Sequence, residues 1–302
     1  MEEYIISCCS NADLSKEHYE KRNIHYLSFE FMLDDDTYLD DLGESIDINE
    51  FYKKMSEGAM TKTIHPDVER YMDYFRTFLE SGKDVLHLTL SSGLSEAYES
   101  AVAAQEALKS EFPDRKLYII DSLAASSGLG LLADAAADKR DEGLSIDELK
   151  DWIEDNRLFV NHWFFSTTLT YYIRGGRISK TAGTMGNIFK ICPLMKVNDE
   201  GKLLVWETVR MKRKVVKATI SKMENLAWDR LDYNGKCYIS HAGCYEDARA
   251  VADIIEQRFP KLDGNVEIYD IGTTIGSHTG PGTVALFFWG EDRGKLLLNM
   301  NI

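Results

Sequence analysis

Three turns rich in glycine and hydroxyl side chains carry the residues of this 302-residue chain that could do chemistry. The first runs from Ser91 to Ser95, where a predicted strand ends and a predicted helix begins. Ligands of open α/β sheets bind at such positions, because a helix N-terminus presents unpaired N–H groups and a partial positive charge. The hydroxyls of Ser91 and Ser92 could hydrogen-bond a carboxylate or a phosphate. A plain N-cap by Ser92 or Ser95 is the alternative.

The second turn places two arginines, Arg174 and Arg177, around the paired glycines Gly175 and Gly176. Glycines permit a tight backbone, and guanidinium groups can clamp an anion through two parallel hydrogen bonds. An ordinary surface turn that happens to carry two arginines is the alternative.

The third turn, residues 275–282, reads Ile-Gly-Ser-His-Thr-Gly-Pro-Gly. Small and hydroxyl residues surround one histidine, His278, which predicts an adaptable loop whose backbone can approach a ligand closely. A histidine with a purely structural role is the alternative.

The chain lacks the sequence motifs of several enzyme classes. The chain has no phosphate-binding loop, no dinucleotide-binding glycine turn, no nucleophile elbow and no zinc-protease helix. Cys237, His241 and Cys244 match no standard metal spacing, and the acidic run 34–36 lacks the pattern of a calcium loop, so we expect no metal. A hydrolase or transferase acting on acyl or phosphoryl groups through Ser92 and His278 stays open, although no orienting carboxylate is evident.

The charge balance disfavours nucleic acid as a partner. The formal net charge is −15, and such a chain is repelled by phosphate backbones unless a basic patch is local. One basic run exists, and its residues predict a solvated helix start: Arg210, Lys212, Arg213, Lys214 and Lys217.

The chain predicts a cytoplasmic protein without an integral membrane segment. No apolar run approaches the roughly 18 residues of a membrane helix, and the first residues are acidic, unlike a secretory signal. The five cysteines are odd in number and form no Cys-x-x-Cys pair, which suits a reducing compartment.

The first half of the chain must position the first turn. Its strands and helices alternate, which predicts a parallel, doubly wound, Rossmann-like α/β domain over residues 1–158. The expected strands are 4–9, 24–29, 85–90 and 117–120, and the expected helices are 47–56, 65–81, 95–109 and 124–140.

The second half has a different pattern of predicted strands and helices. Runs of strands with two helices set apart predict an α+β domain over residues 159–302. The expected strands are 163–168, 203–210, 236–241, 266–271 and 283–289, and the expected helices are 214–226 and 244–259.

Six motifs follow one another along the chain: Ala12-Asp13-Leu14, Thr63-Ile64-His65-Pro66, Ser91-Ser92-Gly93-Leu94-Ser95, Ile120-Asp121-Ser122, Gly175-Gly176-Arg177-Ile178-Ser179 and residues 275–282. In this order they resemble the DegV family, the bacterial fatty-acid-binding proteins that serve as acyl-carrying subunits of fatty acid kinase. The resemblance extends over the whole chain.

The resemblance implies a binding subunit rather than an enzyme. A long-chain fatty acid would lie in an apolar tunnel between the domains and be presented to a separate ATP-dependent kinase, which forms the acyl phosphate for phospholipid metabolism. No cofactor besides the bound acid is implied. The carboxylate would be bound by Thr63, Ser91, Ser92, Arg177 and His278. The supporting loop residues would be Gly93, Ser95, Gly176, Thr279 and Gly280.

The chain departs from the family pattern at three places. Cys9, Ser10 and Asn11 stand where the family usually has Asp-Ser-Thr, and Ile64 and His65 stand where it has Ser-Gln. The usual Gly-Thr after Ser95 is replaced by Glu96-Ala97, which adds a negative charge beside the expected anion site. These changes leave open which acid is bound.

Overall fold

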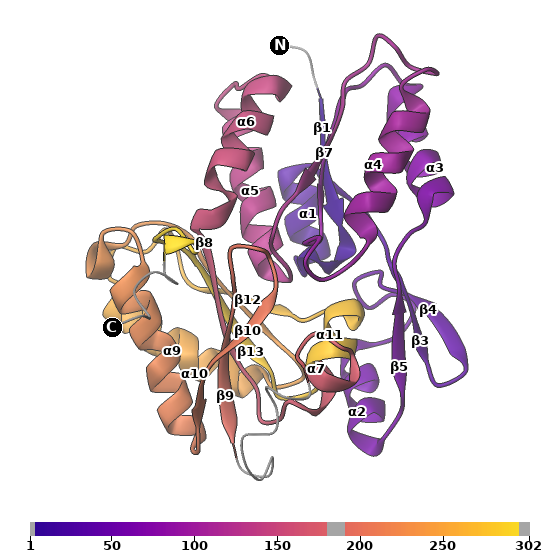
Figure 1. The fold of residues 1–302 in the computed structure, drawn as a ribbon. Helices are drawn as coiled ribbons and strands as arrows, with labels where there is room; N and C mark the ends of the chain where they lie inside the picture. Colours follow the sequence, from indigo (N-terminus) through magenta and orange to yellow (C-terminus); the bar gives the residue numbers. More distant parts are fainter. Residues whose placement is uncertain (1–3, 180–190, 296–302) are drawn as a thin grey trace.

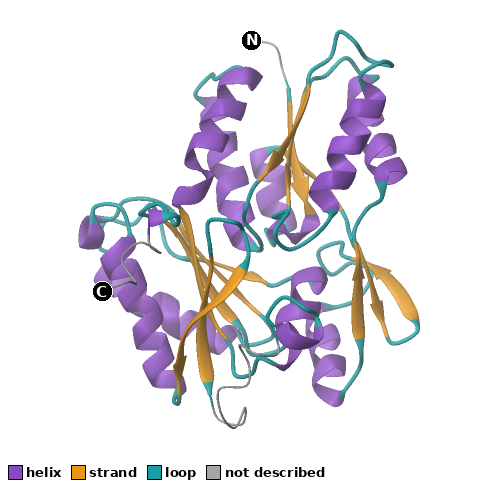
Figure 2. Ribbon diagram, viewed as in Figure 1, coloured by secondary structure: helices purple, strands orange, loops and turns teal. Residues whose placement is uncertain are grey.

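The computed structural model describes residues 4–179 and 191–295, which form two large sheets and one small sheet (Figures 1 and 2). The first sheet has four parallel strands in the order β2-β1-β6-β7. Its strands are β1 (Ile5–Cys9), β2 (Ile24–Leu27), β6 (Val85–Thr89) and β7 (Leu117–Asp121). The doubly wound Rossmann-like topology predicted for the first half is confirmed.

Helices cover both faces of this sheet, which explains why strand β6 is buried at every position. Val85 points toward α3 and α4, and its neighbour Leu86 points toward the opposite layer. The helices of this half are α1 (Lys16–Arg22), α3 (Val68–Leu79), α4 (Ala97–Leu108), α5 (Ser127–Asp141) and α6 (Ile146–Asn156).

The second sheet has six strands in the order β10-β9-β8-β13-β11-β12, and all neighbours are antiparallel except β11 and β12. Its strands are β8 (Val160–Phe165), β9 (Cys192–Val197), β10 (Leu203–Val209), β11 (Cys237–His241), β12 (Glu267–Asp270) and β13 (Val284–Trp289). The helices of this half are α7 (Thr170–Arg174), α9 (Lys212–Leu226), α10 (Tyr245–Arg258) and α11 (Thr273–Thr279). The α+β organisation expected of the second half is confirmed.

Strand β9 was not predicted because it contains a proline and a lysine. Lys196 is nearly fully buried in this strand, with its ammonium 5.0 Å from the ring centre of Trp206 and 6.0 Å from that of Trp163. A cation over aromatic faces can be accommodated in an otherwise apolar layer. Sequence patterning alone does not reveal that arrangement.

A small antiparallel sheet, β4-β3-β5, belongs to the first half in sequence but packs on the second. Its elements are β3 (Glu30–Leu33), β4 (Asp36–Leu39), α2 (Ile48–Glu57) and β5 (Thr61–Ile64). Phe31 and Phe51 share an apolar cluster with Ala242 and Ile271 of the second half. Strands β3 and β4 pair as an antiparallel hairpin, whereas β5 was not predicted. Three single-turn 3-10 helices complete the described chain: η1 (Ser10–Ala12), η2 (Arg157–Phe159) and η3 (Arg230–Asp232).

Helix α5 joins the two halves, because it packs against β1 of the first sheet and against β8, β11 and β13 of the second. At the middle of this helix the buried Asp134 accepts hydrogen bonds from Lys236 (2.5 Å) and Tyr238 (2.9 Å) of the second half. Asp134 also lies 3.1 Å from His18 Nε2 on α1. The boundary after residue 158 therefore separates the two large sheets. That these two halves are separate domains stays a prediction.

This ion cluster predicts a pH dependence of stability. Burial alone would lower the pKa of His18, but hydrogen bonds to Asp134 and Glu267 outweigh it and raise the pKa to about 9. A raised pKa in the folded state gives stability that is complete below the unfolded value of about 6.5 and is lost as the pH rises toward 9. We expect the free energy of unfolding to fall by up to about 3 kcal/mol from this group across that range. Urea titrations between pH 6 and 9 measure it, and His18→Gln, which cannot be protonated, should show a flatter curve. Equal slopes for the two proteins would contradict the assignment.

Candidate functional site

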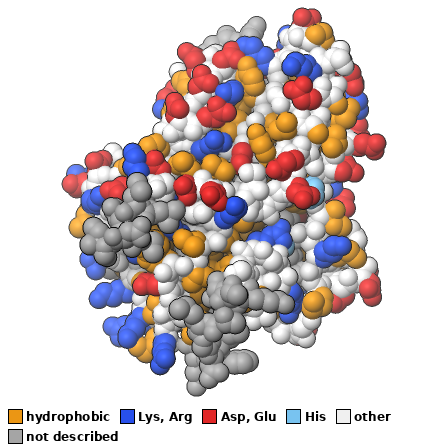
Figure 3. Space-filling view, viewed as in Figure 1, with side chains coloured by type: hydrophobic (Ala, Val, Ile, Leu, Met, Phe, Trp, Pro, Cys, Tyr) orange, Lys and Arg blue, Asp and Glu red, His pale blue; other side chains and the backbone are white. Residues whose placement is uncertain are grey.

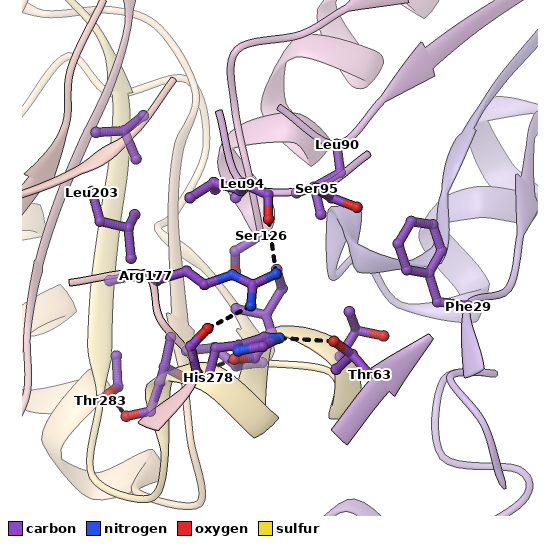
Figure 4. Close-up of a pocket in the computed structure, with 18 of the residues that line it drawn as sticks. Phe29, Thr63, Leu90, Leu94, Ser95, Ser126, Arg177, Leu203, His278 and Thr283 are labelled. Carbon is purple, nitrogen blue, oxygen red and sulfur yellow. Dashed lines mark hydrogen bonds between the residues drawn. The ribbon is translucent and has the colours of Figure 1, made fainter. Parts of the chain in front are cut away.

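A cavity of about 640 Å³ lies where the two halves meet. Strand β5, the turn after β6, the turn after α7 and helix α11 form one end of it, as Figure 4 shows. This volume is within the usual range of small-molecule sites. Four of the five predicted head-group residues line the cavity, namely Thr63, Ser92, Arg177 and His278.

Thr63 and His278 form the centre of the polar end. Thr63 Oγ1 lies 2.9 Å from His278 Nε2, a hydrogen bond in which either atom can be the donor (Figure 4). Burial, together with the positive charge of Arg177, lowers the pKa of His278 to about 3. The imidazole is therefore neutral at neutral pH and offers a hydrogen bond rather than a charge.

Gly175 sets the position of the His278 ring. A Cβ atom at residue 175 would lie 2.3 Å from His278 Nδ1, closer than any packing contact allows. The same Nδ1 is buried and has no hydrogen-bond partner among the residues that the structure describes. The first of the paired glycines therefore provides the space for the ring.

Arg177 brings a cation into the cavity wall. It donates to Gly175 O at 2.6 Å and to Leu94 O at 2.8 Å, and the second of these bonds crosses from one half of the molecule to the other. Burial lowers its pKa below the ordinary arginine value, and no ion pair with a carboxylate is found for it within residues 4–179 and 191–295. A half-buried guanidinium without a carboxylate partner favours an anionic ligand.

Ser92 is paired with a carboxylate rather than with the histidine. Its hydroxyl donates to Asp121 Oδ2 at 2.5 Å, and its N–H donates to Asp121 Oδ1 at 3.1 Å. His278 is bonded to Thr63 instead. The arrangement thus lacks the serine–histidine hydrogen bond on which the alternative hydrolase or transferase depends.

Ser91, the fifth predicted residue, lies behind the cavity wall and not on it. It is fully buried, and its hydroxyl donates to Gly201 O at 2.9 Å in the turn between β9 and β10. A Cβ atom at Gly93 would lie 2.5 Å from Glu200 O of the same turn. Ser91 and Gly93 therefore join the two halves through close backbone contact, and Ser91 lies outside the cavity lining.

The other supporting residues divide into two groups. Ser95 and Thr279 line the cavity. Gly176 and Gly280 lie outside the lining, at positive φ angles of 71° and 73° that favour glycine. At Gly280 a Cβ atom would also overlap the ring of Tyr171 at 2.0 Å.

The expected loop around His278 is wrong, because residues 273–279 form helix α11. Ser277 donates to Thr273 O (2.7 Å) and Thr279 donates to Ile275 O (3.1 Å), so the hydroxyl groups support the helix from within. Glycine and hydroxyl residues favour loops by local propensity. Tertiary contacts override that preference here.

Several wall residues were not predicted. Ser126 adopts φ 55° and ψ −153°, a conformation rare outside glycine, and its hydroxyl donates to the buried Asp13 Oδ2 at 2.5 Å. Thr274 and His162 are also buried wall residues. No sequence motif marks them, since sheet register and helix phase bring them to the cavity. Only the strand expected at 163–168, which begins one residue after His162, gave a partial signal.

The far part of the cavity is apolar. Its wall comes from the sheet of the second half, where β13 contributes Ala285 and Phe287. The N-cap of helix α5, Ser126, and the preceding Ala125 also line the cavity. The remaining apolar side chains of this part are Phe164, Val197 and Leu203.

The cavity rim is charged. The exposed side chains of Lys62 and Arg174 line it together with Glu96, one of the residues at which the chain departs from the family pattern. Glu96 precedes α4 without capping it through its side chain. Cations therefore outnumber carboxylates at the opening, despite the overall negative charge.

The other features singled out in the sequence are the metal-ligating side chains, the basic run and the apolar segments. In the described ranges, no group of three or more metal-ligating side chains could hold an ion, and Cys244 donates its thiol hydrogen to Thr283 O. The basic run 210–217 lies exposed at the start of α9, as the sequence predicts. Figure 3 shows Lys and Arg side chains gathered at the lower left, over the region of α9 and α10. No helix within residues 4–179 and 191–295 is long and apolar enough to cross a membrane.

Comparisons with known proteins cover nearly the whole chain. The model of the DegV family, described as uncharacterised proteins, matches residues 8–291. A DegV domain-containing protein of Clostridium perfringens is 34% identical over 293 residues, covering 97% of this chain and 99% of its own.

Two solved structures share the fold. A DegV lipid-binding protein of Thermotoga maritima has a TM-score of 0.81 at 27% identity, with 97% of this chain and 100% of its own covered. A stearic-acid-binding protein of Eubacterium ventriosum has a TM-score of 0.84 at 26% identity, covering 94% and 97%.

The contact between Gly175 and His278 gives a sharp test of the site. Gly175→Ala keeps an ordinary backbone, since φ is −73°, but forces the His278 ring away from Thr63. We expect the ring nitrogen signals of His278 to shift in nitrogen-15 NMR spectra and the melting temperature to fall by several degrees. Gly176→Ala is the matched control, because its Cβ would meet nothing within 4 Å and costs only backbone strain of about 1 kcal/mol. An unshifted His278 signal in Gly175→Ala would show that the ring has another support.

Proposed function

Because this chain belongs to the DegV family, we propose that it holds one long-chain fatty acid in the cavity between its two halves. The observation that carries the proposal is the division of this single cavity into a polar end and an apolar end. Relatives above 25% identity support it, since one is described as lipid-binding and another as stearic-acid-binding.

The carboxylate would lie at the polar end, beside Thr63, His278 and Arg177. A carboxylate withdrawn from water needs several donors at once. Arg177 supplies the charge, and the neutral His278 and the Thr63 hydroxyl supply hydrogen bonds.

Ser92 would take part from the side of the first half. Its proton is donated to Asp121, so it can donate to a ligand only after that bond is released. Ser91 would act from behind the wall, by keeping the turn of the first half against Gly201.

The acyl tail would extend between Phe164, Leu203 and Phe287. Each methylene that leaves water contributes about 0.8 kcal/mol, so a long chain supplies most of the binding free energy. The polar end then selects an acid from other lipids of the same length.

We further propose that the protein acts as a binding subunit and not as the catalyst. It would present the carboxylate to a separate ATP-dependent fatty acid kinase, for phospholipid metabolism. The motif resemblance supports this role, and the pairing of Ser92 with Asp121 instead of His278 fits it. A cytoplasmic location is part of the same proposal, in keeping with five cysteines that are all free in the described residues.

Mass spectrometry of lipids extracted from the purified protein tests the ligand class directly. We expect one long-chain fatty acid per molecule. Arg177→Met should lower the affinity for hexadecanoic acid about 100-fold, because the half-buried cation is lost. The matched control is Arg174→Met, which removes the exposed arginine of the same turn and should change the affinity less than threefold. Absence of any acyl chain, together with no uptake of added acid, would refute the proposal.

The alternative function, a hydrolase or transferase that uses Ser92, can be tested separately. It would be supported if the protein turned over acyl esters or acyl phosphates and Ser92→Ala abolished that turnover. We expect no turnover by the wild-type chain in the absence of a kinase.

The apolar end predicts how chain length can be changed. Ala285→Phe fills part of the cavity, so an octadecanoic acid loses contact for about two to three methylenes and binds about 10- to 50-fold more weakly. Octanoic acid should bind nearly as before. Leu203→Ala, which widens the same part, is the matched variant and should not discriminate against the longer acid. Equal losses for both acids in Ala285→Phe would mean that the tail lies elsewhere.

A further inference from the structure

Helix α11, which carries His278, cannot be stable by itself. It has only seven residues, and its N-cap is Gly272, which has no side chain to accept a hydrogen bond from the first turn. Isolated helices of this length are not populated in water, so the position of α11 must be determined by its neighbours.

Two buried aspartates from the first half hold its N-terminal end. Asp13 Oδ1 accepts the N–H of Gly272 at 3.0 Å. Asp40 Oδ1 accepts the N–H of Thr273 at 3.0 Å and its hydroxyl at 2.8 Å. Both aspartates are 3% exposed, and carboxylates at a helix N-terminus are favourable partners of the helix dipole.

The second oxygen of each aspartate reaches toward the cavity wall. Asp13 Oδ2 accepts the hydroxyl of Ser126, which lines the cavity. Asp40 Oδ2 accepts the hydroxyl of Ser10, whose oxygen in turn accepts the N–H of Phe29, another wall residue. The two carboxylates thus connect α11 with two wall segments of the other half.

Gly272 is fitted between the carboxylates. A Cβ atom there would lie 2.8 Å from Asp13 Oδ1 and 3.0 Å from Asp40 Oδ1. Its φ of −64° is ordinary, so alanine at this position would be rejected by contact alone and not by backbone strain.

We infer that Asp13 and Asp40 are positioning residues of the head-group site. They hold α11 from the opposite half of the molecule, so that His278 stays within hydrogen-bond distance of Thr63. This inference rests on the proposed function for the identity of the ligand. Its geometric part, the coupling of the two aspartates to His278, does not.

The test compares an acid with an alcohol of equal length. Asp40→Ala removes both bonds to Thr273, Gly272→Ala displaces the helix, and Thr273→Val removes only the hydroxyl bond. We expect the affinity for hexadecanoic acid to fall about tenfold or more in the first two and about threefold in Thr273→Val. The affinity for hexadecanol should stay within twofold, because His278 acts on the carboxylate. Leu108→Ala, in the apolar layer between α3 and α4, is the control for a general loss of stability and should leave the acid-to-alcohol ratio unchanged.

The ring nitrogen signals of His278 in the ligand-free protein give a second readout. They should shift in Asp40→Ala, Gly272→Ala and Thr273→Val and not in Leu108→Ala. If these three variants fold and keep the wild-type His278 signals and the wild-type acid-to-alcohol affinity ratio, the inference is overturned. If Asp40→Ala does not fold, Gly272→Ala and Thr273→Val decide. If the wild-type protein binds neither lipid, the proposed function fails, and the ring signals alone decide whether the aspartates position His278.

Discussion

A buried polar group needs a partner, and at the junction of the two halves of this protein the partners come from across the junction. Arg177 donates to the carbonyl of Leu94, Ser91 to that of Gly201, and Gly272 to the carboxylate of Asp13. If the halves separated, water would replace each partner, so each bond contributes a net of about 0.5–1.5 kcal/mol to holding them together. The cavity therefore exists because these bonds keep its two sides together.

The same bonds bear on how a ligand enters and is held. Arg177 serves the junction and the polar end at once, and Ser92 is bonded to Asp121 in the arrangement described. In the proposed complex, a carboxylate would compete with protein acceptors for donors that are already used. The hydrogen bonds gained at the polar end would then be partly offset, and the apolar tail would be the main source of affinity.

Glycine is placed where the two halves or two elements approach most closely. Gly175 gives space to the His278 ring, Gly93 to the carbonyl of Glu200, and Gly272 to two carboxylates. Only one role of glycine, its freedom at positive φ, follows from turn chemistry. The three positions named here require the absence of a Cβ atom instead, which is a property of the neighbours.

The sequence by itself determined the four strands of the first sheet, the change of architecture near residue 158, and the family, because hydrophobic period and turn motifs are local patterns. It also indicated four residues that line the cavity, namely Thr63, Ser92, Arg177 and His278. Tertiary structure alone decided that Ser91 lies behind the wall, that residues 273–279 are helical, and that a buried lysine occupies β9. It alone brought Ser126, Asp13 and Asp40 to the site. These features depend on groups far apart in the chain, where a bond across the junction outweighs a local propensity of a few tenths of a kcal/mol.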